Sequence, residues 1–559
     1  MTDMKRIDFT QEQTDSLLLR VKANRLKEGD YEIIKAIIDT LTLLCQAYDK
    51  KTTSIKRLLR MIFGARTEKT KNVLGADADN KDVCDDHPDD SFSSDNPACG
   101  CNPEDRNDTP GKKRKGHGRN GADTYTGADR IYIPCTKLKH RDPCPLCIKG
   151  KVYKMKVPGL VVKMFGRAPV AAKIWEYEKL RCNLCGEIFE PDLPKEAIAA
   201  KEKKYDETAK SMIALLKYGF GFPFYRQEKL QACLGFPLAS STQWDKAEQG
   251  ANLIYPAFEE MKRKAAQGDI IHNDDTTVKI LELMKDEDES VRKGMFTTGI
   301  LSIKAGRKIA LFFTGQQHAG ENFADLLEKR DFNRGPPIQM CDALSRNFSE
   351  TDNVILTHCN VHGRRNFVDV AENFPDECRY VLKVFEAIYK NDDITKKQDM
   401  SPDERLRFHQ DRSGPVMDKF YRWLNEQFDA KKVEPNSGLG KAITYMKNHW
   451  VKLTRFLQVP GAPLDNNILE QALKRVILNR KNSLFYKTLH GAYIGDMYMS
   501  LIHTCILNGG NPFDYLTQLQ KHSPAVFKNT SRWMPWNYES TIAAMMSDPS
   551  LNIQCSIEA

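Results

Sequence analysis

The chain has 559 residues, more than one hydrophobic core usually organises, so several domains are expected. Hydrophobic residues make up 41% and charged residues 28% of the chain, which excludes a wholly disordered or fibrous protein. No apolar run is long enough to cross a membrane, and the first residues contain no apolar signal segment, so a cytoplasmic location is expected.

The net charge of +9 is unevenly distributed along the chain. Residues 77–108 contain eleven acidic residues against two basic ones, Lys81 and Arg106, a net charge of −9, so the remainder carries +18. This bias favours a polyanionic partner, although solubility alone would also account for it.

Residues 15–70 carry a heptad pattern typical of a coiled coil. Counted from Ile34, eight of the nine a and d positions are apolar or aromatic, and Lys51 is the exception. The pattern predicts a leucine-zipper-like helix that joins two copies of the chain; the alternative is an amphipathic helix that packs on its own chain. Residues 71–119 follow as an acidic linker, expected to be disordered because it lacks large apolar side chains.

A basic arm ends this linker. Residues 111–121 read GKKRKGHGRNG, with glycines on both sides of the cations. Such a run suits the phosphates of nucleic acid, and a solvated linker is the alternative. The candidate DNA-binding residues here are Lys112, Lys113, Arg114, Lys115 and Arg119.

Two C-x-x-C pairs predict a structural zinc site within residues 120–200. Paired thiolates can surround one Zn²⁺ tetrahedrally, and in a reducing cytosol clustered cysteines favour metal over disulfides. Segments 151–165 and 173–182 have the composition of strands, which predicts a zinc ribbon with an enlarged hairpin. Cys135 and His140 are substitutes if one of the four cysteines is not a ligand. The predicted ligands are Cys144, Cys147, Cys182 and Cys185.

Residues 201–266 are expected to be helical. Two helices flank the break at residues 235–237, and Ser240 is predicted to be the N-cap of the second. The pattern is compatible with a helix-turn-helix, but any helical layer would look similar.

Strand patterns begin at residue 269, and Lys-Ala-Gly-Arg at 304–307 signals a hairpin. Three strands, then alternating helices and strands, predict a ribonuclease H-like sheet. Residues 376–456 predict a helical insertion, in which Ser401, Pro402 and Glu404 form a capping box. The expected strands are 269–272, 297–303, 308–314, 337–341 and 354–357, and the expected helices between and after them are 321–329 and 362–370.

Three carboxylates are candidates for a two-metal site. Asp274 and Asp342 are placed at predicted strand ends, and Glu470 lies on a helix that starts at Ile468. Mg²⁺ prefers oxygen ligands, and a pair of Mg²⁺ ions can activate a water or 3′-hydroxyl and stabilise the leaving oxygen in phosphoryl transfer. Spacing alone is a weak signal, because the chain has 75 acidic residues.

Several segments resemble, in the same order, those of the insertion sequence 66 family of bacterial DDE transposases. Residues 273–278 resemble the family's D-E-T-P-V segment, residues 358–367 its C-W-A-H-A-R-R-x-F, and residues 465–472 its D-N-N-x-x-E-R-A. The resemblance spans about residues 15–540. Further similar segments are 60–69, 217–228, 479–485, 501–516 and 534–537.

The resemblance implies a multidomain α/β transposase. Its ribonuclease H-like core would comprise residues 267–375 and 457–510, followed by a C-terminal segment at 511–559. Asp274, Asp342 and Glu470 would hold two catalytic Mg²⁺ ions. The implied DNA-phosphate contacts are Arg364, Arg365, Arg480 and Lys481.

The implied partner is double-stranded DNA with terminal inverted repeats, in the nucleoid of a bacterial cell. The zinc ribbon and basic arm would bind the transposon ends, and the protein would work as a homodimer or larger assembly. The sequence leaves open whether other element-encoded proteins are required. The alternative functions are an inactive or domesticated DNA-binding relative and a zinc-stabilised scaffold without a nucleic-acid role.

The sequence departs from the family pattern at several positions. Asp275 stands beside Asp274 and is a second candidate ligand. Gln471 and Lys474 replace arginines, and Asn360 replaces a tryptophan.

Two histidines, His358 and His362, have the four-residue spacing of a helical metal site. Only His362 lies in the resembling motif, beside Arg364 and Arg365, where a structural or phosphate contact is the favoured interpretation.

Overall fold

A computed structural model describes residues 20–22, 30, 140–143, 146, 150–153, 168–181, 188–285, 292–348 and 353–547. The heptad positions from Ile34, the acidic linker, the basic arm and the four predicted zinc cysteines lie outside these residues. None of the helices within the described ranges is long and apolar enough to cross a membrane.

The chain divides into two compact units. The first unit consists of Met1–Lys81, Met340–Ala343 and Leu356–Asn466, and the second of Asp82–Gln339, Leu344–Ile355 and Asn467–Ala559.

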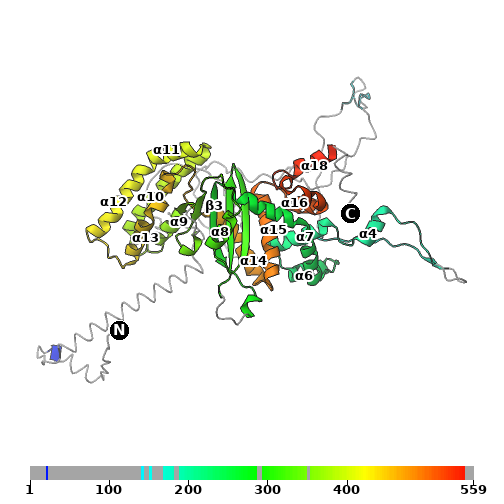
Figure 1. Ribbon diagram of the computed structural model, residues 1–559, viewed down its shortest axis with the longest axis horizontal. Coiled ribbons are helices and arrows are strands. Elements are labelled where there is room, and N and C mark those ends of the chain that lie inside the picture. The colour runs from blue at the N-terminus through cyan, green and yellow to red at the C-terminus, as the bar shows by residue number, and fades with distance from the viewer. Residues whose placement is uncertain are drawn as a thin grey trace. The chain divides into compact units, whose positions relative to one another are not determined.

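A five-stranded sheet organises the mixed α/β fold (Figure 1). The strand order is β5-β4-β3-β6-β7, and β3, β4 and β5 are antiparallel neighbours. The strands are β3 (Ile270–Thr277), β4 (Phe296–Lys304), β5 (Arg307–Gly315), β6 (Ile338–Cys341) and β7 (Ile355–His358).

Strand β3 is longer than its apolar pattern predicts. The expected strand ends at His272, but β3 pairs with β4 as far as Thr277, so Asp274 lies within the strand and not at its end. The extension consists of polar residues, which are compatible with a strand here because buried side chains such as Asn273 have hydrogen-bond partners.

The predicted hairpin between β4 and β5 is present. Ala305 and Gly306 have φ values of 47° and 77°, the left-handed conformation that a two-residue turn between antiparallel strands requires.

Helices of the second unit pack around β3, β4 and β5. Helix α15 covers β5, and α7 packs against α15, with Ile254, Phe258, Tyr498 and Leu501 fully buried between the layers. The helices are α4 (Lys195–Glu202), α5 (Glu207–Ala214), α6 (Phe224–Cys233), α7 (Ser240–Ala265), α8 (Ala319–Leu327), α14 (Asn467–Ser483), α15 (Leu489–Leu507), α16 (Pro512–Lys521), α17 (Ser523–Lys528) and α18 (Tyr538–Ser547).

The predicted N-cap of α7 is wrong by one residue. Ala239 is the N-cap, and Ser240 is the first helical residue. The Ser240 hydroxyl and N–H both donate to the Glu228 carboxylate of α6, which therefore satisfies the helix end in place of a serine cap.

The first unit is helical after β7. Its helices are α9 (Asn360–Val368), α10 (Pro375–Lys397), α11 (Pro402–Arg412), α12 (Gly414–Asp429) and α13 (Gly438–Leu453). The capping box at Ser401 is present, since the Glu404 carboxylate accepts from the Ser401 N–H at 2.9 Å and Pro402 opens α11.

Short antiparallel pairings flank the predicted zinc knuckles. Strands β1 (Leu180–Arg181) and β2 (Ile188–Phe189) pair with each other, and Pro143 forms a bridge with Lys151. The strand expected at 173–182 is thus confined to β1 within the described residues, and Ile174 is 82% exposed, so no sheet face buries that segment.

Candidate active site

Asp274 lies on the face of β3 that α14 covers. Its cross-strand partner is Gly299 of β4, and directly paired residues point to the same face of a sheet. A methyl group at Gly299 would lie 2.8 Å from Leu473 Cδ2 and 3.2 Å from Leu469 Cδ1. Helix α14 therefore crosses close above this residue pair, and Glu470 is in its first turn.

A buried amide cluster holds the Asp274 carboxylate. Asn347 Nδ2 donates to Asp274 Oδ1 at 3.2 Å. The backbone carbonyl of Asn347 accepts from Asn273 Nδ2 at 2.7 Å and from Gln339 Nε2 at 2.9 Å. Since all three amide side chains are fully buried, their hydrogen bonds restrict Asp274 to a narrow range of positions.

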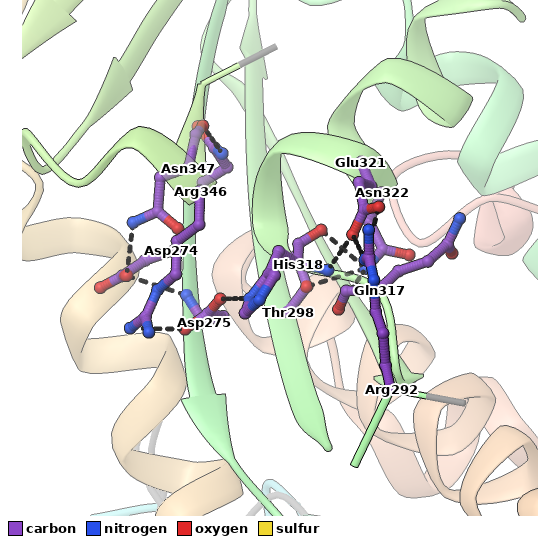
Figure 2. Close-up of polar contacts among 11 residues, drawn as sticks. Asp274, Asp275, Arg292, Thr298, Gln317, His318, Glu321, Asn322, Arg346 and Asn347 are labelled. Atoms are coloured by element: carbon purple, nitrogen blue, oxygen red, sulfur yellow. Dashed lines mark hydrogen bonds and ion pairs between the residues drawn. The ribbon is translucent and has the colours of Figure 1, made fainter. Parts of the chain in front are cut away.

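Asp275 points away from Asp274 and lies between two basic side chains (Figure 2). Its Oδ2 is 3.0 Å from His318 Nδ1, and its Oδ1 is 3.1 Å from an Arg346 guanidinium nitrogen. The Asp275 side chain is 1% exposed. Each carboxylate oxygen of Asp275 therefore has a basic side chain within 3.1 Å.

Asp342 follows β6 directly, and β6 is the neighbour of β3 in the sheet. The residue is 9% exposed. Burial, followed by the charge of Asp342, raises the pKa of Tyr445 on α13 above its ordinary range, so the phenol stays protonated near this carboxylate.

Three of the four predicted phosphate-contacting residues are partly buried. Arg480 donates to Thr276 Oγ1 at 3.0 Å and to Thr277 Oγ1 at 3.2 Å, and thereby ties α14 to the end of β3. Arg364 and Arg365 are half-buried on α9, whereas Lys481 is exposed.

The two histidines do not form a helical pair. His358 is the last residue of β7, and His362 lies on α9, because the chain changes from strand to helix between them. Burial, with Lys452 and His449 nearby, lowers the pKa of His358 to about 3, so its imidazole is neutral.

Asn360 has a structural role at the position where the family pattern has tryptophan. Its side chain is fully buried and donates to the carbonyls of Leu453 at 3.0 Å and Leu464 at 3.1 Å. These hydrogen bonds attach the start of α9 to the segment that precedes Asp465.

The donor chemistry of the predicted triad fits Mg²⁺, since every side chain offers carboxylate oxygens and none offers sulfur or imidazole nitrogen. The sequence did not predict His318, Arg346 or Asn347, which belong to no motif. The only signal was proximity in the chain, because Arg346 follows Asp342 by four residues.

Comparison with known proteins gives one family match. The family described as "Transposase IS66 family" matches residues 203–494, more than half of the chain.

Three similar proteins come from Sinorhizobium fredii (strain NBRC 101917 / NGR234). Uncharacterized protein y4hP is 23% identical over 390 residues, covering 66% of this chain and 68% of the relative. Uncharacterized protein y4jD is 30% identical over 203 residues, or 35% of this chain and 39% of the relative. Uncharacterized protein y4qI is 26% identical over 193 residues, or 34% of this chain and 35% of the relative.

Proposed function

The chain belongs to the IS66 family of transposases, and we propose that it cuts and joins DNA strands by two-metal phosphoryl transfer. Family membership implies an enzyme of transposition that binds DNA and suggests a divalent metal. The observation that carries the finer proposal is the position of Asp274 on the face of β3 that α14 covers, with Glu470 in the first turn of that helix.

The strand order supports a ribonuclease H-like core. Three antiparallel strands, β3, β4 and β5, occupy one side of the sheet, and β6 and β7 continue it beyond β3. In this arrangement Asp274 on β3 and Asp342 after β6 belong to neighbouring strands. We assign residues 267–375 and 457–510 to this core and residues 376–456 to a helical insertion.

Asp274, Asp342 and Glu470 are the proposed Mg²⁺ ligands. The bound ions would supply activation of the attacking hydroxyl and stabilisation of the leaving oxygen. The protein's own contribution is to orient the carboxylates: the amide of Asn347 holds Asp274, and the contact of Leu469 and Leu473 with β4 holds the helix that carries Glu470.

Basic residues are proposed to hold the DNA backbone. Lys481 is exposed and suited to a direct phosphate contact, and we extend the proposal to Arg364 and Arg365 on α9. For Arg480 the contacts with Thr276 and Thr277 support a structural role that accompanies any contact with DNA.

The proposal includes the segments before the core. Residues 15–70 would dimerise the protein, and residues 112–119 would bind DNA phosphates. Residues 120–200 would form a zinc ribbon that binds transposon ends. The pairings β1–β2 and Pro143–Lys151 support the ribbon, because each joins the residues on either side of one C-x-x-C pair.

The test is an isosteric removal of each ligand. For Asp274→Asn, Asp342→Asn and Glu470→Gln we expect loss of strand cleavage and joining with DNA binding retained, because the basic residues are unchanged. The losses should not add, since one missing ligand already disables the site. The matched control is Asp269→Asn, an exposed carboxylate immediately before β3 that pairs with Arg334.

Two results would contradict the proposal. If all three triad variants still join strands on terminal inverted repeats with Mg²⁺ or Mn²⁺, these carboxylates are not the ligands. If the unaltered protein binds the repeats but never cleaves them, the chain is a DNA-binding relative without chemistry.

A further inference from the structure

We propose that Asp275 and Arg346 are positioning residues for the metal site: their ion pair fixes the turn that carries Asn347, and Asn347 fixes Asp274. This inference rests on the proposed function, because it assumes that Asp274 is a ligand. It assigns a role to the carboxylate beside Asp274, which family resemblance left as an alternative ligand.

The first step is the burial of Asp275. A carboxylate that is 1% exposed is stable in its charged form only with close partners, and Arg346 and His318 supply them at 3.1 and 3.0 Å. Both basic side chains also lie against Phe296, with the His318 ring at 4.2 Å and the Arg346 guanidinium at 5.8 Å from its ring. Both partners of Asp275 therefore also contact one aromatic ring.

The second step is the connection from Arg346 to Asp274. Arg346 and Asn347 are consecutive residues of the short 3₁₀ turn η4 (Ser345–Asn347). Asn347 Nδ2 donates to Asp274 Oδ1 at 3.2 Å, while the backbone carbonyl of Asn347 accepts from Asn273 and Gln339. A displacement of Arg346 therefore moves the adjacent amide that holds the proposed ligand.

The third step is the support of this turn from α8. Gly320 lies in the first turn of α8, and a methyl group there would overlap the backbone carbonyl of Phe348, so helix and turn are in direct contact. The helix start is itself restrained, because the Glu321 carboxylate accepts from the His318 N–H at 2.7 Å. Arg292 binds the same carboxylate at 2.6 and 2.7 Å (Figure 2).

Together these contacts fix η4 beside β3. Asp275 binds Arg346, Asn273 donates to the backbone carbonyl of Asn347, and the side-chain amide of Asn347 donates to Asp274. A metal ligand whose orientation depends on hydrogen-bonded neighbours typically loses about 10- to 100-fold in metal affinity when those neighbours are removed.

The experiment measures Mn²⁺ binding to the full chain by electron paramagnetic resonance, without DNA. Arg346→Gln is the informative variant, because Arg346 is 43% exposed and glutamine keeps a hydrogen-bond donor for Asp275; its thermal unfolding midpoint is measured in parallel. Loss of a positive charge near the site would by itself tighten binding of a dication. Positioning predicts the opposite sign, an affinity about 10-fold weaker, with partial recovery in Arg346→Lys.

Two further variants serve as a control and as a second test of the ion pair. Arg334→Gln is the matched control, since Arg334 is a 33% exposed arginine that pairs with Asp269 before the start of β3, and it should bind Mn²⁺ like the unaltered protein. Asp275→Asn should also weaken binding. Because Asp275 is buried, the thermal unfolding midpoint of this variant is also measured, and the conclusion is drawn from Arg346→Gln.

The outcomes separate this inference from the proposed function. If Asp274→Asn does not reduce Mn²⁺ binding, the proposed ligand is wrong. If Asp274→Asn abolishes binding but Arg346→Gln binds Mn²⁺ equally or more tightly, the positioning role alone is overturned. Arg346→Gln with normal Mn²⁺ affinity and weakened DNA binding would likewise overturn it and assign Arg346 to phosphate contact.

Discussion

A single methyl group at Gly299 tests how α14 is held over β3. In Gly299→Ala the new Cβ would lie 2.8 Å from Leu473 Cδ2 and 3.1 Å from Leu473 Cγ. Unbonded carbon atoms pack at about 3.5–4.0 Å, so Leu473 must retreat by roughly 0.7 Å or more. Leu473 is 4% exposed and Leu469 is fully buried, which leaves little free space for that movement.

The expected cost follows from this geometry. Overpacking a buried contact typically costs about 1–3 kcal/mol, so the thermal unfolding midpoint should fall. The displaced helix carries Glu470 in its first turn, and a 1 Å misplacement in an active site can reduce a rate by about 100-fold. We therefore expect the rate of DNA cleavage by Gly299→Ala to be reduced even at a temperature where the variant is fully folded, so that unfolding does not account for the loss.

The matched control is Gly315→Ala at the end of β5. No atom lies within 4 Å of a methyl group at Gly315, so this variant should be neutral or slightly more stable. Calorimetry and a single-turnover cleavage assay on both variants decide the matter. The prediction is wrong if Gly299→Ala unfolds and cleaves like the unaltered protein, or if Gly315→Ala is equally impaired. In either case the close approach of α14 to β4 does not position the first turn of α14.

Three further predictions concern charge, metal and assembly. Burial raises the pKa of Asp496 to about 7, so the stability gained from its protonated form is present below its ordinary pKa near 3.8 and is lost as the pH rises towards 7. In chemical denaturation, the unfolding free energy of the unaltered protein should therefore fall between pH 4.5 and 7.5 by on the order of 3–4 kcal/mol more than that of Asp496→Asn, at about 1.4 kcal/mol per pKa unit. Equal pH profiles of the two proteins would contradict this. Native mass spectrometry should find one zinc per chain that is lost on replacing the C-x-x-C cysteines, whereas a fully folded zinc-free protein would exclude the ribbon. Charged replacements of Leu41 and Leu44 should shift sedimentation towards monomer, and unchanged sedimentation would indicate that the heptad seam packs within the chain.

The positions of most secondary-structure elements could be predicted because they depend on local patterns. Runs of strand-favouring residues located β4 and β5 to within one residue at each end, and the predicted hairpin between them contains an Ala-Gly turn with left-handed backbone. The capping box of α11 was equally local, since Ser401 and Glu404 satisfy each other within one helical turn.

Predictions failed where a distant partner decides the local structure. The end of β3 carries polar residues that would not form a buried strand alone, and Gln339, 66 positions away from Asn273, supplies the hydrogen bond that stabilises it. Ser240 has the character of an N-cap, but the carboxylate of Glu228 occupies that role from the preceding helix. Neither partner could be found from local periodicity.

Asp274 and Asp275 show what the register of a strand adds to a sequence motif. Resemblance aligned Asp274 with a catalytic aspartate but could not exclude its neighbour, since both are carboxylates at adjacent positions. Successive residues of a strand point to opposite faces, so only one of the two can share the face on which α14 packs over Gly299. The other then lies beside Arg346 and His318 and forms a buried ion pair. The same alternation makes a one-residue error in the alignment testable: Asp275→Asn with Asp274 intact should retain a weakened metal site, whereas Asp274→Asn with Asp275 intact should retain none.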